Sequence, residues 1–132
     1  MAKYIYPAIF TPEENGAFSI RFPDIDNCFT CGDDLQDGIN MAEDVLALMM
    51  TQLEDKKDSI PQASAIKNLT TENDEFATYI SCDTAMYRRL MNNAAVKKTL
   101  TIPSWLNDSA VAAGLNFSQV LQDALKRQLN LM

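Results

Sequence analysis

The C-terminal segment of this chain, residues 97–132, holds more apolar side chains than so short a stretch can bury by itself. Residues 97–102 alternate as a strand does, and Pro103 follows at a position suited to the first turn of a helix. One helix then closes at Gly114, and a second opens at Asn116. A lone strand leaves its backbone groups unpaired, and about 40 residues is the lower limit for folding alone. A symmetric dimer, in which two such strands pair antiparallel over four helices, resolves both problems.

Alternation along residues 97–102 divides the side chains of this module into an inward set and an outward set. The inward set predicts a dimer core of Leu100, Ile102, Leu106, Val120, Leu121 and Leu125. A two-stranded ribbon fits the major groove of DNA, where lysine and threonine contact base edges, and a helix N-terminus can hold a phosphate. The DNA contacts predicted on these grounds are Lys97, Thr99, Thr101, Asn116 and Ser118. The alternative is a solvated strand edge followed by an ordinary helix cap.

The N-terminal residues predict a separate α+β domain. Segments typical of strands lie at residues 4–10, 17–22, 28–31 and 76–82. Asn15-Gly16, between the first two, is a strong hairpin signal. Pro7 requires an open side on the first strand, because proline has no N–H to donate to a neighbour. With a helix between the third and fourth strands, the order is β-β-β-α-β.

The helix of this domain has a clear start. Asp34 can cap it, and Asp37 sits in the first turn, where the helix dipole favours an acidic side chain. Gly38 costs helix stability relative to alanine, which favours a close approach of the backbone to its neighbour. One buried face is predicted from the spacing of Leu35, Ile39, Ala42, Leu46, Met49 and Leu53.

The chain is predicted to have three parts. Residues 1–83 form the first domain, and residues 84–96 form a connector that begins with a short helix capped by Asp83 or Thr84. Residues 97–132 form the module for dimerisation and DNA binding.

Charge is distributed unevenly between these parts, although the net charge is −7. Residues 1–92 carry 7 Lys/Arg and 16 Asp/Glu, a net −9, whereas residues 93–132 carry 4 and 2, a net +2. Such a chain suits two kinds of partner, one basic and one polyanionic. The acidic residues predicted to face a basic protein are Asp24, Asp26, Asp33, Asp34 and Asp37.

The sequence offers little for catalysis. It has no histidine, and it contains no phosphate-loop or nucleophile-elbow motif. Cys28 and Cys31 form a lone C-x-x-C, but in a strand they point to opposite faces about 10 Å apart, too far for a disulfide. With only Cys82 left over, we interpret the cysteines as structural. We expect no metal, no cofactor and no enzymatic activity. No apolar run reaches the roughly 20 residues that span a bilayer, so a cytoplasmic protein is expected.

At this point two stretches resemble known families. Residues 97–129 resemble the ribbon-helix-helix DNA-binding module, with a short strand, a proline, a helix, a glycine-led turn and a second helix. The first domain resembles the N-terminal domain of HicB antitoxins. The matching phrases are Tyr6-Pro7-Ala8, residues 18–24 (FSIRFPD) and residues 28–33 (CFTCGD), with Pro61 in the loop after the helix.

The resemblance to HicB antitoxins implies a partial ribonuclease-H-like first domain that occludes a small basic mRNA-cleaving toxin, HicA. It also implies that the antitoxin, alone or with its toxin, represses its own operon by binding operator DNA as a homodimer. Two alternatives stay open. One is a stand-alone ribbon-helix-helix repressor whose N-terminal domain senses a small ligand. The other is a weak metal-dependent nuclease of the ribonuclease-H type.

Overall fold

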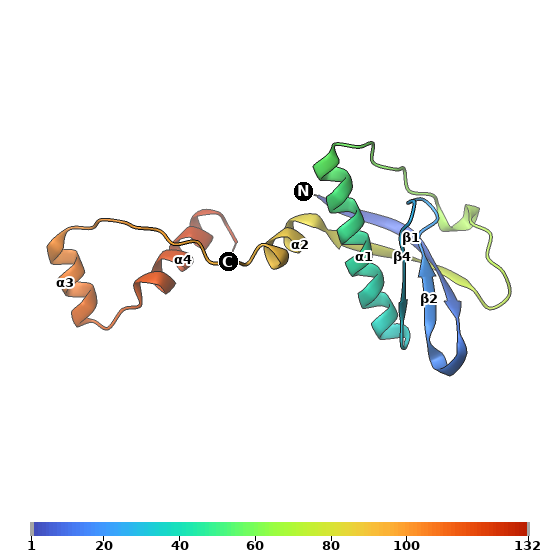
Figure 1. The fold of residues 1–132 in the computed structure, drawn as a ribbon, viewed down its shortest axis with the longest axis horizontal. Helices are drawn as coiled ribbons and strands as arrows, with labels where there is room; N and C mark the ends of the chain where they lie inside the picture. The colour runs from blue at the N-terminus through green and yellow to red at the C-terminus, as the bar shows by residue number, and fades with distance from the viewer. Residues whose placement is uncertain (1, 132) are drawn as a thin grey trace. The chain divides into compact units, whose positions relative to one another are not determined.

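The structure, a computed structural model, describes residues 2–131, and the contacts within it divide the chain into two units between Ala94 and Ala95. Figure 1 colours the first unit from blue to yellow and the second from orange to red. No helix in the described residues is long and apolar enough to cross a membrane.

The first unit contains an antiparallel sheet in the order β3-β2-β1-β4. Its strands are β1 (Lys3–Pro12), β2 (Phe18–Arg21), β3 (Phe29–Gly32) and β4 (Phe76–Asp83). The turn between β1 and β2, η1 (Glu14–Gly16), holds Asn15 and Gly16 at φ of 62° and 80°. Asparagine and glycine adopt this left-handed conformation most readily, which explains the hairpin. The predicted order β-β-β-α-β and the α+β class are confirmed; the likeness to ribonuclease H stays a prediction.

Pro7 lies inside β1, which is a central strand of the sheet. β2 pairs with β1 only from Ile9 to Pro12, so Pro7 lies beyond the end of β2. On its other side Pro7 is paired with Tyr79 of β4. The missing N–H is tolerated because this half of β1 has a strand neighbour on one side only, as the sequence predicted.

Helix α1 (Leu35–Lys56) covers one face of the sheet (Figure 1). The backbone N–H of Asp37 donates to the side chain of Asp34 at 2.8 Å, which confirms the predicted cap. The core lies between this helix and the inner face of the sheet. Its buried members are Tyr6, Ala8, Phe10, Ile20, Phe22, Ile25, Cys28, Ala42, Leu46, Met50 and Ile80.

The first turns of α1 bury a different face from the predicted one. Leu35 is 48% exposed and Ile39 is 36% exposed, so their prediction as buried residues was wrong. Gly38 is buried instead, and a Cβ built on it would lie 3.2 Å from Cδ1 of Ile20. Because Gly38 has no side chain, the backbone of α1 lies closer to the sheet here than it could with a leucine at this position. The prediction was confirmed further along, where Leu46 is fully buried.

The loop between α1 and β4 is fastened to the rest of the first unit by polar contacts. It includes the 3-10 turn η2 (Ile66–Asn68). Ser64 donates its backbone N–H and its hydroxyl to the carboxylate of Asp24, at 2.8 and 2.6 Å. The hydroxyl of Tyr6 donates to the carbonyl of Pro61. These contacts join the loop to the segment between β2 and β3, through Asp24, and to β1, through Tyr6.

Strand β4 continues directly into α2 (Thr84–Met91). The side chain of Asp83 caps this helix by accepting from the N–H groups of Ala85 and Met86 at 3.0 and 3.3 Å. Helix α2, assigned to the connector from the sequence, packs against α1 and lies in the first unit.

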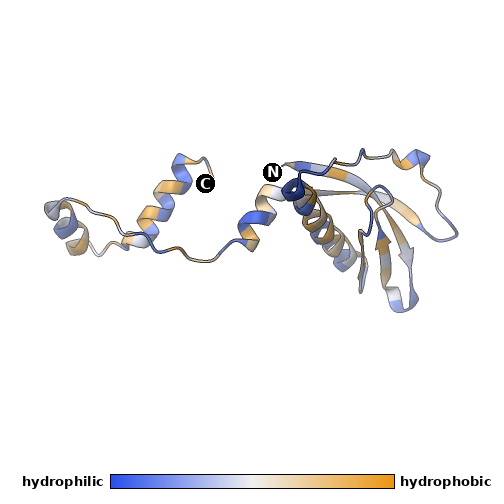
Figure 2. Cartoon of the chain, turned by 45° about the horizontal axis from the view of Figure 1, so that its top comes forward, coloured by the Kyte–Doolittle hydropathy of each residue, from blue (hydrophilic) through white to orange (hydrophobic). Residues whose placement is uncertain are grey.

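The second unit consists of α3 (Ser104–Ala112) and α4 (Phe117–Gln128). The chain turns between them at Gly114, whose φ of +70° suits glycine. Apolar residues recur along α4 between polar ones (Figure 2). Residues 92–103 form neither helix nor strand. The strand predicted at 97–102 needs a second chain to pair with, and a single chain does not test it.

Candidate interaction surfaces

The second unit has no interior of its own. None of its described residues, 95–131, is buried. The residues predicted for the dimer core are exposed by 41% at Leu106 to 64% at Leu100, except that Leu121 is half-buried. Fully burying an apolar side chain stabilises a fold by about 1.5–3 kcal/mol, and in the single chain these side chains realise only part of that. Their exposed faces are therefore available to a partner surface.

The residues predicted to contact DNA fall into two local environments. Lys97, Thr99 and Thr101 are exposed on the segment without regular structure. Asn116 caps α4, accepting from the N–H of Gln119 at 3.0 Å. The hydroxyl of Ser118 accepts from the side-chain amide of Gln122 at 3.2 Å. The cap leaves part of the first turn of α4 open at its N-terminus, where the helix dipole is positive.

The five acidic residues of the first domain have different roles in the fold. Asp24 is tied to Ser64, Asp34 caps α1, and Asp37 accepts from the N–H of Asp33 at 2.8 Å. The carboxylates of Asp26 and Asp33 are exposed and accept no hydrogen bond within the described residues. These two are therefore the most available of the five for a partner.

The acidic residues belong to a longer stretch that lacks positive charge. Residues 22–55 contain nine Asp/Glu and no Lys/Arg. Arg88 forms ion pairs with Glu54 at 3.0 Å and Asp55 at 2.9 Å. The other seven carboxylates have no ion pair with a Lys or Arg side chain among the described residues. The loop before β3, the end of β3 and the first half of α1 thus carry charged side chains of one sign only.

Glu54 connects three elements at the other end of α1. Its carboxylate accepts from Tyr4 of β1 at 2.8 Å, Thr84 of α2 at 3.0 Å and Arg88 at 3.0 Å. Burial raises the pKa of Glu54, but the hydrogen bonds outweigh it and lower the pKa to about 2. Burial and the bond to this carboxylate raise the pKa of Tyr4 to about 12. Glu54 therefore holds α2 against the sheet and α1.

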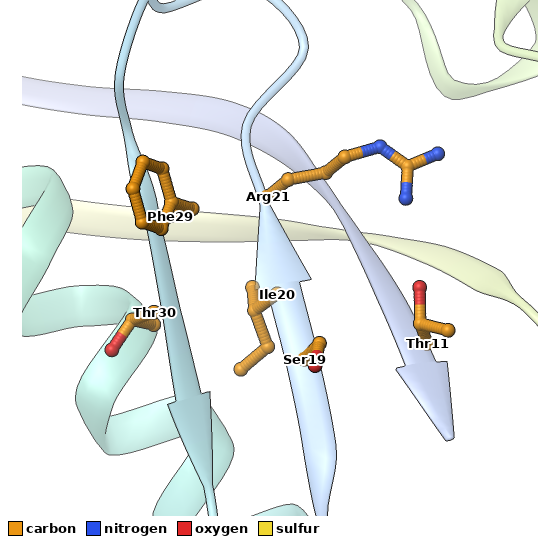
Figure 3. A pocket seen from close by; sticks show the side chains of 6 residues that line it. All are labelled: Thr11, Ser19, Ile20, Arg21, Phe29 and Thr30. Atoms are coloured by element: carbon orange, nitrogen blue, oxygen red, sulfur yellow. The ribbon is translucent and has the colours of Figure 1, made fainter. Parts of the chain in front are cut away.

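A second carboxylate, Glu75, fastens the start of β4 to the outer face of the sheet. It accepts from Arg21 at 3.0 Å and from the hydroxyl of Thr11 at 2.6 Å. The hydrogen bond from Arg21 is the largest cause that lowers the pKa of Glu75 to about 2. Beside it is a shallow hollow lined by Thr11, Ser19, Ile20, Arg21, Phe29 and Thr30 (Figure 3).

The cysteines and acidic residues do not gather into a metal site within residues 2–131. Cys28 is buried, Cys31 is exposed, and Cys82 is partly buried, all as free thiols. Burial raises the pKa of Cys28 and of Cys82 to about 11, so both thiols stay protonated at neutral pH.

The contacts of Glu54 and Glu75 were not identified from the sequence. The side chains that donate to these two carboxylates lie 30 to 64 positions away in the chain, as with Thr84 and Glu54 or Thr11 and Glu75. The spacing of residues along the sequence does not indicate contacts between positions so far apart. The one available signal was that each glutamate lies at the end of an element, which is also where solvated charges are common.

Comparisons with known proteins agree with this architecture. Residues 6–123 match the family described as "HicB_like antitoxin of bacterial toxin-antitoxin system". A chain in the "Toxin-Antitoxin complex from Streptococcus pneumoniae" is similar with 27% identity and a TM-score of 0.61, covering 96% of this chain and 99% of that one. The "Antitoxin HicB3 crystal structure" is similar with 26% identity and a TM-score of 0.52, covering 95% and 97%.

Another solved structure, the "HicA3 and HicB3 toxin-antitoxin complex", contains a chain that matches over a shorter length. It covers 61% of this chain and 99% of its own, with 23% identity and a TM-score of 0.51, which shows a shared fold. Residues 95–132 are too few to account for that share, so the match includes much of the first unit. No curated protein sequence matches the chain.

Proposed function

Because this chain belongs to the family of HicB-like antitoxins of bacterial toxin–antitoxin systems, we propose that its first unit binds and occludes a small basic HicA-type toxin. The observation that carries this proposal is the run from residue 22 to residue 55, which has nine carboxylates and no basic side chain. Such a surface attracts and orients a basic partner. The similar chains in a toxin–antitoxin complex and in a HicA3–HicB3 complex support it. The chain acts stoichiometrically here, not as an enzyme.

The second unit completes this proposal by dimerising and binding operator DNA. Its support is the lack of any buried residue in 95–131, because a ribbon-helix-helix dimer would cover those apolar faces. Two strands at 97–102 would pair, with Leu100 and Ile102 inward and Lys97, Thr99 and Thr101 in the major groove. The N-terminus of α4, at Asn116 and Ser118, would meet phosphates.

Joining the two activities in one chain links repression to the amount of toxin. An antitoxin dimer offers two first units and would carry two toxins. A stable contact needs about 800 Å² on each partner, which a unit of this size can provide. Two DNA-binding modules held in one assembly also gain affinity through effective concentration.

The experiment is co-expression with the protein encoded by the adjacent reading frame, followed by size-exclusion chromatography with light scattering. We expect a complex with equal numbers of both chains and loss of the partner's RNA cleavage. The same complex is then titrated onto DNA from its own promoter in a gel-shift assay. A chain that shifts the DNA but binds no neighbouring protein would instead be a stand-alone repressor.

A further inference from the structure

The open edge of β3 is the part of the first unit that is best prepared to receive a partner strand. β3 is one of the two outer strands of the sheet, and β2 covers only one of its sides. The N–H of Phe22 donates to the carbonyl of Cys28 at 3.0 Å. This bond identifies Cys28 as a residue whose backbone groups face β2. In an antiparallel pair, the backbone N–H and C=O groups of every second residue bond to the neighbouring strand, and those of the residues in between point to the opposite side. The backbone groups of Phe29 and Cys31 therefore face the open side.

The side chains at this edge also favour a partner. Phe29 is 69% exposed, and its cross-strand partner Arg21 places it on the outer face of the sheet. Figure 3 shows Phe29 beside the hollow that Arg21 and Thr11 line. An exposed aromatic residue on an open edge promotes unwanted pairing, and folded proteins normally protect such edges. Acidic residues lie before and after β3, and its outer edge has no neighbouring strand.

The charge around the edge selects the kind of partner. Asp26 precedes β3 and Asp33 follows it directly, and both carboxylates are exposed. The first turns of α1, next in the chain, add further acids and the exposed Leu35 and Ile39. Pairing of two β3 edges from two copies would bring these acids together, and repulsion opposes it. A basic chain gains attraction at the same place.

The other outer strand is less suited to this role. β4 lies against η2, and the hydroxyl of its Tyr79 accepts from the N–H of Ile66 at 3.1 Å. The loop between α1 and β4 therefore already contacts β4. The main contacts of β3 among the described elements are with β2, its neighbour in the sheet, and with α1, which lies on one face of the sheet.

From these observations we propose that the toxin adds an extended, basic segment to β3 as a fifth strand of the sheet. Backbone hydrogen bonds to Phe29 and Cys31 would give the segment its register, and the Phe29 ring would pack against its alternate side chains. The acidic residues before and after β3 would pair with Lys and Arg side chains flanking that segment. This inference rests on the proposed function, since the basic partner is the toxin.

The first test is amide hydrogen exchange, measured by NMR on the full chain with and without the toxin from the adjacent reading frame. We expect the amides of Phe29 and Cys31 to become protected on binding, whereas the amide of Ile5 should not. A toxin that binds but leaves both β3 amides unprotected overturns the proposal and leaves the antitoxin function standing. A chain that binds no toxin overturns both. Protection of the same amides in the chain alone, rising with concentration, would assign the edge to a second copy and overturn it as well.

The second test uses variants of the full chain and measures toxin affinity by calorimetry. In Cys31→Pro the lost N–H is one that points away from β2, so the fold is retained while the new strand loses a hydrogen bond. Phe29→Ser removes the exposed ring, and Ile5→Ser, 59% exposed on the same sheet face of β1, is the matched control. We expect about tenfold or weaker binding for the first two and no change for the control. Equal affinity in all three variants would overturn the proposal, and thermal unfolding confirms that each is folded.

Discussion

Gly32 and Gly38 stand so close that a Cβ built on Gly32 would lie 2.4 Å from the Cα of Gly38. This contact joins the end of β3 to the first turns of α1. Backbone meets backbone there, so no side chain can rotate away to make room. The distance sets how near the helix lies to the sheet and thereby fixes the position of the acidic first turns beside the β3 edge.

The first prediction is that Gly32→Ala destabilises the first unit by about 3 kcal/mol, because the added methyl group forces the helix away from the sheet. Gly16→Ala is the control. A Cβ at Gly16 has open space but must adopt a φ of +80°, so its cost is about 1 kcal/mol. Urea unfolding followed by circular dichroism measures both. A Gly32→Ala variant as stable as the wild type would mean that the two backbones can separate freely.

The second prediction concerns acid stability. The pKa of Glu54 is about 2 in the folded chain and near 4.5 when unfolded, so its contribution is present above pH 4.5 and is lost as the pH falls towards 2. Glu54→Gln should cost about 2 kcal/mol at pH 7 and flatten the pH dependence between 4.5 and 2. Urea titrations at several pH values measure this, with the exposed Glu43→Gln as control. If the two variants behave alike, Glu54 does not hold α2 in place.

The third prediction is that Ile102→Glu makes the chain monomeric, because two buried carboxylates would face each other in the proposed dimer core. Light scattering should give the mass of one chain, while the first unit stays folded and still binds toxin. Val96→Glu, at an exposed position just before the proposed strand, should leave the dimer intact. Persistent dimerisation of Ile102→Glu would place the dimer interface elsewhere.

The fourth prediction separates a phosphate contact from a base contact at Lys97. If Lys97 meets a phosphate, Lys97→Ala weakens operator and unrelated DNA alike and lowers the slope of log affinity against log salt by about one. Gel-shift titrations at several salt concentrations measure the slope. Unchanged affinity for the operator would remove Lys97 from the interface.

The sequence predicted the elements whose signals are local. The Asn15-Gly16 turn, the Asp34 cap and the end of α3 at Gly114 each depend on neighbouring residues, and each lies where it was expected. The burial of the first turns of α1 was predicted wrongly. Helical spacing identifies which residues share a face, but not which face meets the sheet. In the first turns of α1 the face that carries Gly38 packs against the sheet, which leaves Leu35 and Ile39 exposed.

The candidate surfaces could be predicted only in part for a similar reason. The acidic stretch at residues 22–55 can be recognised from its amino-acid composition alone. Which carboxylates stay available depends on contacts with distant residues, such as the one between Asp24 and Ser64, 40 positions apart. The open side of β3 follows from the strand order, and the strand order is a property of the whole sheet.

The lack of a buried residue between 95 and 131 also bears on the lifetime of the protein in the cell. If the second unit dimerises as proposed, the dimer dissociates when the chain is diluted, whereas the first unit has a core of its own. The separated module and residues 92–103 are then open to proteases. Falling antitoxin levels would thus release the promoter before they release the toxin, and the concentration at which pairs dissociate becomes a threshold for new synthesis.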